Sequence, residues 1–94
     1  MSSADTLILS DFTVGTIPEL QEELIRHLMG AGAVAVDRSG VHRPNSAMLQ
    51  LLAAFSRDLL AQSRSIQWCG ESPAFDRAAK TLGLTASLGL PADG

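Results

Sequence analysis

The stretch Ala33-Val-Ala-Val-Asp-Arg-Ser-Gly-Val-His-Arg-Pro-Asn-Ser-Ala-Met-Leu-Gln-Leu-Leu52 joins an apolar run to a polar loop and then to a second apolar pattern. Residues 33–37 are continuous and apolar, which predicts a strand buried on both faces. Residues 38–44 contain a Ser-Gly turn signal and end in a proline, which predicts a loop. Asn45 or Ser46 is then suited to cap a helix, because its side-chain oxygen can accept a free backbone N–H. The segment therefore predicts a strand, a loop and a helix in succession.

The predicted helix after this loop carries a wide apolar face over nearly five turns, which is typical of a central, well-covered helix. Its apolar positions are Met48, Leu51, Leu52, Phe55, Leu59 and Leu60.

Toward the N-terminus, residues 6–9 and 12–14 are short β-prone runs separated by Ser-Asp, which predicts a hairpin or a bent edge strand. Thr16 and Glu19 have the spacing of a capping box at the start of a helix. The apolar stripe of that helix consists of Ile17, Leu20, Leu24 and Leu28, at helical spacing.

Toward the C-terminus, residues 65–69 predict another strand, and Ser72-Pro73 predicts a third helix start. The inner stripe of that helix is expected at Phe75, Ala78, Ala79 and Leu82, and a last apolar segment contains Leu84, Leu88 and Leu90. Strands that alternate with helices imply parallel pairing through right-handed crossovers. We expect an α/β domain of two layers, with a mixed, mostly parallel sheet of four to five strands and three to four helices mainly on one face.

The chain has 94 residues, which suits one domain over 1–94 with tails at 1–5 and 91–94. A net charge of −3 gives no electrostatic footprint for nucleic acid. The single cysteine, Cys69, excludes an internal disulfide. No apolar run reaches the ~20 residues of a membrane-spanning helix. The N-terminus lacks the pattern of a secretory signal, so we expect a cytoplasmic protein without direct membrane insertion.

Catalytic patterns are weak. Ser39, His42 and Asp37 share one loop, which leaves a small enzyme as a rival hypothesis, but their spacing is that of a polar loop and no nucleophile elbow is present. Cys69 with His27 or His42 would be the alternative nucleophile pair. Neither histidine has a known metal-ligand spacing. We therefore expect no catalytic residue, no metal and no cofactor.

Phosphate-binding motifs are also missing. A phosphoryl-accepting receiver domain has a similar alternation of strands and helices. It would need clustered acidic residues, whereas here Asp11 alone follows the first strand. Asp37 ends a strand without supporting acids or a suitably placed lysine. The remaining feature is the helix start at Asn45 and Ser46, where free N–H groups serve either an ordinary cap or a bound partner.

Five segments, taken together in their order and spacing, resemble the signature of STAS domains, the small folds of bacterial anti-sigma factor antagonists. The matching segments cover nearly the whole chain and are 16–24, 33–52, 66–75, 82–84 and 88–90. In that family a buried strand leads through a loop to an Asp-Ser/Thr-x-Gly-Leu helix start, and the matching run here is Asn45-Ser-Ala-Met-Leu49. The resemblance implies a two-layer STAS-like fold and a protein that binds without catalytic turnover.

The helix start departs from the family pattern at three positions. Asn45 replaces the aspartate, Ala47 replaces the usual phosphoacceptor, and Met48 replaces the glycine. Because alanine has no hydroxyl, the resemblance leaves Ser46 as the possible phosphoacceptor. The implied partner-binding residues are Arg43, Asn45, Ser46, Ala47 and Met48, with the last two supplying apolar area and Arg43 a charged rim.

The resemblance implies a nucleotide-binding kinase or ATPase as partner. The first expectation is an anti-sigma factor antagonist-like module in a partner-switching, transcriptional or chemotaxis pathway of bacteria, where the partner is an anti-sigma factor. The alternative is the STAS subunit of a phospholipid ABC transporter, which has a threonine at the position of Ser46 and binds an ABC ATPase. Residues 84–93 also resemble the end of that subunit. A homodimer stays open.

Overall fold

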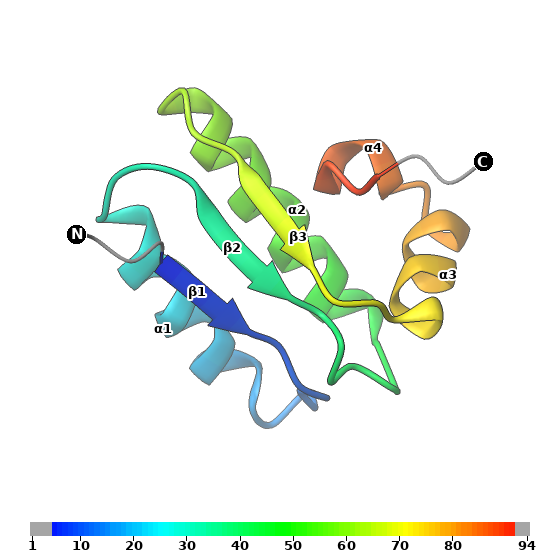
Figure 1. The fold of residues 1–94 in the computed structure, drawn as a ribbon. Coiled ribbons are helices and arrows are strands. Elements are labelled where there is room, and N and C mark those ends of the chain that lie inside the picture. Colours follow the sequence, from blue (N-terminus) through cyan, green and yellow to red (C-terminus); the bar gives the residue numbers. More distant parts are fainter. Residues whose placement is uncertain (1–4, 92–94) are drawn as a thin grey trace.

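Three parallel strands form the sheet (Figure 1). The computed structural model describes residues 5–91. Within them the strands are adjacent in the order β1 (Asp5–Ile8), β2 (Val34–Asp37) and β3 (Ile66–Cys69). Four helices follow the alternation predicted from the sequence: α1 (Ile17–Leu28), α2 (Ser46–Ala61), α3 (Pro73–Thr81) and α4 (Thr85–Leu88). The predicted α/β class with mainly parallel pairing is confirmed.

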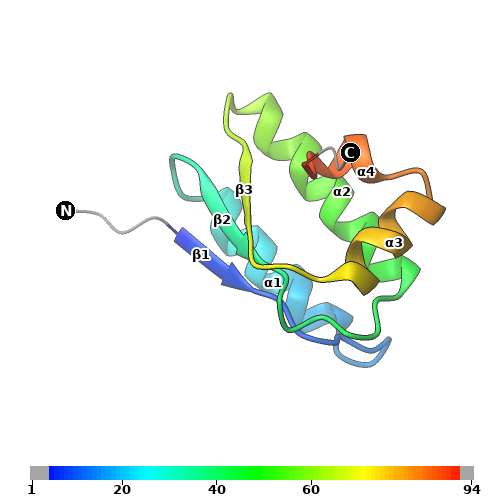
Figure 2. The same ribbon diagram turned by 45° about the vertical axis from the view of Figure 1, so that its right-hand side comes forward.

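The helices lie on one side of the sheet (Figure 2). In β2, the side chains of Val34 and Val36 are fully buried against them, whereas Ala35 and Asp37 are only half-buried. The prediction that this strand is buried on both faces is therefore wrong. The other face carries no helix among the described residues, so Ile8 at the end of β1 is 70% exposed.

The predicted hairpin does not form, which is why the sheet has three strands instead of four or five and no antiparallel edge among the described residues. After β1 the chain turns at once, because the N–H of Phe12 donates to the carbonyl of Ser10 at 3.0 Å. The carbonyl of Thr13 then accepts from the N–H groups of Thr16 and Ile17. Residues 12–14 thus serve as the entrance to α1.

The capping box predicted for α1 is absent. The hydroxyl of Thr16 accepts a hydrogen bond from the N–H of Thr13 at 2.8 Å and makes no cap bond to the helix. The apolar stripe faces the sheet as predicted, with Leu20 and Leu24 buried, and Pro18 lies in the first turn of the helix. The helix is therefore fixed mainly by its apolar stripe, in keeping with the rule that tertiary packing dominates short helices.

The core lies between the sheet and α2, whose buried face includes Met48, Leu49, Leu52, Phe55 and Leu59. Leu60 was predicted to belong to this face but is 62% exposed. Leu59 in the same turn is fully buried, so Leu60 is exposed because it lies about 100° further round the helix, at the edge of the buried face.

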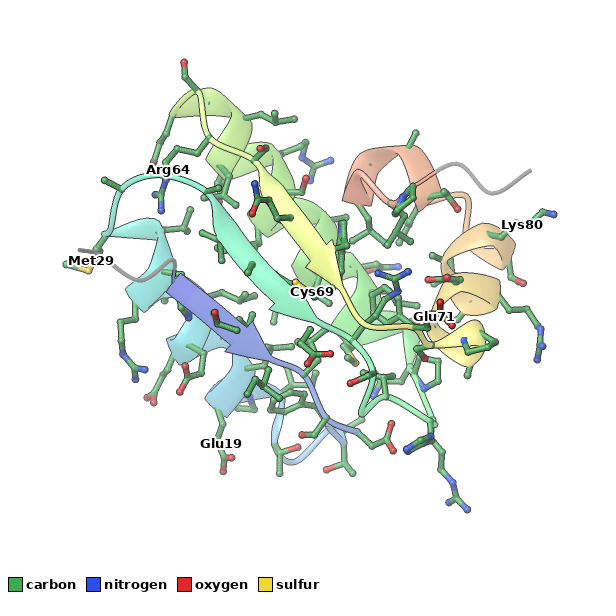
Figure 3. The ribbon with its side chains drawn as sticks, in the orientation of Figure 1. Glu19, Met29, Arg64, Cys69, Glu71 and Lys80 are labelled. Atoms are coloured by element: carbon green, nitrogen blue, oxygen red, sulfur yellow. The ribbon has the colours of Figure 1, made fainter. Side chains whose placement is uncertain are left out.

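The C-terminal end of α1 is capped by the side chain of Arg64, which lies just after the C-terminal end of α2. Arg64 is 9% exposed, and its guanidinium donates to the carbonyls of His27, Leu28 and Gly32 at 3.0, 3.1 and 2.8 Å. These carbonyls belong to or follow the last turn of α1, where acceptors lack helical partners. Figure 3 shows Arg64 beside the connection from α1 to β2.

On the α3 side of the molecule, the last apolar segment packs against α2 and contacts Trp68 of β3. Leu88 and Leu90 are buried, and the indole N–H of Trp68 on β3 donates to the carbonyl of Leu88 at 2.9 Å. Trp68 also packs against Phe75 of α3, with ring centroids 5.4 Å apart.

Candidate functional site

The N-terminus of α2 is capped by Asn45, one of the two residues predicted for that role. Its backbone is extended, and its side-chain oxygen accepts from the N–H of Met48 at 2.9 Å. The amide nitrogen of Asn45 donates to the carbonyl of Phe12 at 2.6 Å. A carboxylate in this place could cap the helix but could not donate to that carbonyl. Asparagine therefore ties the tip of α2 to the segment between β1 and α1.

Asp11 fixes the loop before α2 from the same side. One carboxylate oxygen accepts from the N–H groups of His42 and Arg43 at 2.7 and 2.6 Å. The hydrogen bond from the N–H of Arg43 is the main cause that holds the pKa of Asp11 below its ordinary value of 3.8, and the bond from His42 acts in the same direction. The receiver-type role considered for Asp11 is not needed to explain its position, because the carboxylate is engaged by this loop.

The connection from β3 to α3 holds the loop from the opposite side. The hydroxyl of Ser72, the predicted cap of α3, accepts from the N–H of Phe75 at 3.1 Å and donates to the carbonyl of Val41 at 2.7 Å. Arg38 is buried and lies 3.0 Å from the carboxylate of Asp76 on α3. The loop before α2 is thus held on one side by Asp11 and on the other side by Ser72 and Asp76.

At this tip, three of the predicted binding residues reach the surface. Arg43, Ser46 and Ala47 are exposed, and no hydrogen bond is found for the hydroxyl of Ser46 among the described residues. Asn45 is half-buried. Met48 is completely buried in the core, so the expectation that it offers apolar area to a partner is wrong. The physical reason is its place on the inner face of α2, where a large side chain fills space under the loop.

A shallow hollow of about 350 Å³ adjoins this tip and continues onto α3. Its walls come from the start of α2 and from one flank of α3: Pro44, Asn45, Ser46, Leu49, Ala74, Arg77, Ala78, Thr81 and Leu82. The sequence predicted Leu82 on the inner stripe of α3, but its side chain is 41% exposed beside the hollow. The residues of α3 were not predicted as part of the site. Alanines at 74 and 78, one helical turn apart, are the signal that could have indicated a depression there.

The geometry gives the enzyme hypothesis no support. The carboxylate of Asp37 accepts from the backbone N–H of Ser39 at 2.9 Å, and Ser39 is the main cause that lowers the pKa of Asp37. The described contact of His42 runs from its backbone to Asp11 instead. The bond between Asp37 and Ser39 forms a turn, and the bond between Asp11 and His42 holds the loop before α2. Neither bond aligns a hydroxyl, an imidazole and a carboxylate for catalysis.

The other chemical candidates lie apart. Cys69 is exposed on the open face of the sheet, and its thiol contacts the carbonyl of Gln67 at 3.6 Å (Figure 3). Among residues 5–91 no group of three or more histidine, cysteine or acidic side chains could hold a metal ion. The arrangement at the α2 tip can therefore present a fixed surface to another molecule, with one free hydroxyl at its centre.

Comparison with known proteins concerns the chain as a whole. The family model described as Mlab, STAS domain matches the chain over residues 4–90. A search of curated proteins gives no match. No helix in the described part of the chain is long and apolar enough to cross a membrane.

Proposed function

Because this chain belongs to the STAS domain family, whose members are regulatory modules that mediate protein–protein interaction, we propose that it binds a nucleotide-binding protein through the tip of α2. The observation that carries the proposal is the exposed hydroxyl of Ser46 on a helix start that is fixed from both sides by Asn45, Asp11 and Ser72. A surface that keeps its shape without a partner loses less conformational freedom on binding.

The hollow beside the tip extends the proposed interface onto α3. Leu82 and the alanines of α3 supply apolar area, Arg77 at the hollow supplies positive charge, and Arg43 is an exposed cation in the loop before the tip. The free N–H groups at the start of α2 add a partial positive charge. Although the chain as a whole has a net charge of −3, this surface therefore favours an acidic, partly apolar segment of the partner.

The proposed pathway is an anti-sigma factor antagonist-like one, either partner switching or chemotaxis, in which the partner is a nucleotide-binding kinase. Ala47 lies exposed at the position where the family carries its usual phosphoacceptor. A phosphate switch in this chain would have to use Ser46, where a phosphoryl group would sit at the first turn of α2 and be stabilised by the helix dipole. A cytoplasmic location belongs to this proposal, because kinases of this type use ATP there.

A second candidate is the accessory subunit of a phospholipid ABC transporter, in which the partner is the ATPase. The missing hydroxyl at position 47 and the exposed one at position 46 favour it, because the subunit that this chain resembles has a threonine at the position of Ser46 that engages its ATPase.

Site-specific photo-crosslinking in cells tests the proposal. A photoreactive residue at Ala47 is expected to give adducts with a nucleotide-binding protein. The same residue at Gln67, which is exposed on the open face of the sheet, is expected not to give them. Identical adducts from both positions, or adducts from Gln67 alone, would contradict the site. The identity of the crosslinked protein distinguishes a kinase from an ABC ATPase.

With the crosslinked protein purified, Ser46→Ala is expected to weaken binding at least tenfold, and Ser46→Asp more strongly. The unfolding free energy is expected to change by less than about 0.5 kcal/mol, because Asn45 and not Ser46 caps α2. Ser65→Ala, at the other end of the sheet, is the matched control. Unchanged affinity in both Ser46 variants would refute the role of this hydroxyl.

A further inference from the structure

The outer flank of α1 exposes apolar side chains that the core does not use. Ile25 and Met29 are 51% and 83% exposed, and Pro18 is exposed as well. Their separations of seven and four residues place them on one side of the helix, away from the buried Leu20 and Leu24. Figure 3 shows Met29 directed away from the sheet at the end of α1. Single exposed apolar residues are common, but a row along one helix flank indicates an interface.

Charges beside this row have opposite signs at its two ends. Glu19 and Glu22 lie in the first half of α1 and make no ion pair among the described residues. Arg26 lies one turn after Glu22, and its guanidinium is 3.0 Å from Glu23 while its side chain remains 68% exposed. The flank is therefore acidic toward its start, basic toward its end and apolar between.

We infer that this flank is a self-association surface on which α1 packs antiparallel against α1 of a second copy of this chain. A two-fold axis at the level of Leu24 would place Glu22 opposite Arg26 of the second copy, and the reverse. Ile25 would meet its counterpart near the axis, and Met29 would lie against the turn that carries Pro18. A two-fold interface must be self-complementary, and a flank whose charge order reverses along its length has this property.

The second copy is favoured over an unrelated chain because one rotation pairs both charged positions and both apolar positions of the same patch. The contact is small, since a 12-residue helix is about 18 Å long. A standard stable interface buries about 800 Å² on each partner. The expected dimer is therefore weak, with a dissociation constant in the micromolar to millimolar range.

The dimer would also leave the proposed partner site open. α2 separates α1 from α3 in both ribbon views, so the hollow between α2 and α3 lies on the side away from the proposed dimer surface (Figures 1 and 2). Each dimer would thus carry two partner-binding tips. The inference does not depend on the identity of that partner.

Sedimentation equilibrium of the full chain at 10 μM to 2 mM tests the proposal, with these concentrations chosen as roughly the range that a contact of this size requires. A monomer–dimer equilibrium is expected. Ile25→Glu is expected to weaken it at least tenfold. Leu60→Glu is the matched control, because Leu60 is also more than half exposed but lies on α2, and it is expected to change the equilibrium less than threefold.

Charge reversal tests the antiparallel arrangement itself. Glu22→Arg and Arg26→Glu are each expected to weaken the dimer at least fivefold, and the double variant is expected to return it to within threefold of the original. Thermal melts of every variant verify that the fold is retained. A chain that stays monomeric at 2 mM, equal effects of Ile25→Glu and Leu60→Glu, or a double variant no better than the single ones would overturn the inference.

Discussion

At the scale of single residues, the proposed site depends on two side chains that bind the same two segments in different ways. Asp11 accepts from two N–H groups of the loop before α2, and Asn45 donates back from the start of α2 to the carbonyl of Phe12. Each bond crosses between chain segments more than 30 residues apart. The loop geometry is thus held by polar atoms that no apolar pattern in the sequence would reveal.

The pH dependence of stability should report the bond made by Asp11. Its pKa is lower in the folded chain, so its stabilising effect is complete above its ordinary value of 3.8 and is lost as the pH falls through the folded value. We expect the unfolding free energy to fall below about pH 5, and to fall less steeply in Asp11→Asn, which cannot take up the proton.

Urea denaturation at several pH values between about 7 and 3 measures this difference. Ser65→Ala is the control, since Ser65 is exposed and carries no carboxyl group. If the unfolding free energy of Asp11→Asn depends on pH as steeply as that of the wild type, the hydrogen bonds of the Asp11 carboxylate do not contribute to stability. Asp37, whose pKa is lowered mainly by the N–H of Ser39, adds to the acid sensitivity in the same direction.

At the scale of elements, the junction of β2 and β3 with their following loops is the tightest part of the fold. Gly70, directly after β3, has a φ of 70°, and a Cβ there would lie 2.5 Å from a carboxylate oxygen of Asp37 and 2.9 Å from Cβ of Ser39. The two strands can therefore end side by side only if this position has no side chain. The turn at Asp37 and Ser39 is therefore shaped by the residue that directly follows the neighbouring strand.

Gly70→Ala and Gly83→Ala separate backbone strain from crowding. Gly83 has a similar φ of 72° but open space around its Cβ position. Gly83→Ala is expected to cost about 1 kcal/mol from the left-handed conformation alone. Gly70→Ala is expected to cost about 2–4 kcal/mol, because the contact with Asp37 and Ser39 adds to that strain.

Chemical denaturation of both variants gives the comparison. Equal losses of unfolding free energy in Gly70→Ala and Gly83→Ala would mean that Asp37 and Ser39 move away from the new side chain at no cost. The close approach at Gly70 would then not hold the loop before α2.

At the scale of the whole molecule, one helical layer covers one face of a short sheet, and α4 completes that layer. Leu88→Ala is expected to cost about 2–5 kcal/mol, because its side chain is fully buried beside α2 and β3. Leu60→Ala removes the same atoms from a 62% exposed position and should stay within about 0.5 kcal/mol. Similar losses in the two would show that α4 does not contribute to the core.

Apolar periodicity was enough to predict the order of elements and most of the core. The helix stripes of α1 and α2, the caps at Asn45 and Ser72, and the alternation that makes the sheet parallel all follow from local patterns. The hairpin failed because the carbonyl of Thr13 is used by the start of α1 and that of Phe12 by Asn45, 33 positions away. The apolar periodicity of a sequence does not show which distant residues will form such hydrogen bonds.

The site was predicted in part for the same reason. The helix start was visible from its residue types, and its cap is confirmed. The burial of Met48 depends on how a helix rotates over the sheet, and the hollow on α3 depends on two helices that are distant in sequence. Both are properties of packing, which one chain segment does not determine. The binding roles of Arg43, Ser46 and Ala47 stay predictions.

The capping of α1 by Arg64 bears on how the chain assembles during synthesis. The last carbonyls of α1 find their donors on a residue 36 or 37 positions later. The carbonyl of His27 also accepts from the nearby N–H of Gly30, whereas the carbonyl of Leu28 receives its bond from Arg64. Until a ribosome has added Arg64, the last turn of α1 therefore lacks part of its hydrogen bonding, and it gains that part only once the residues of α2 have been made.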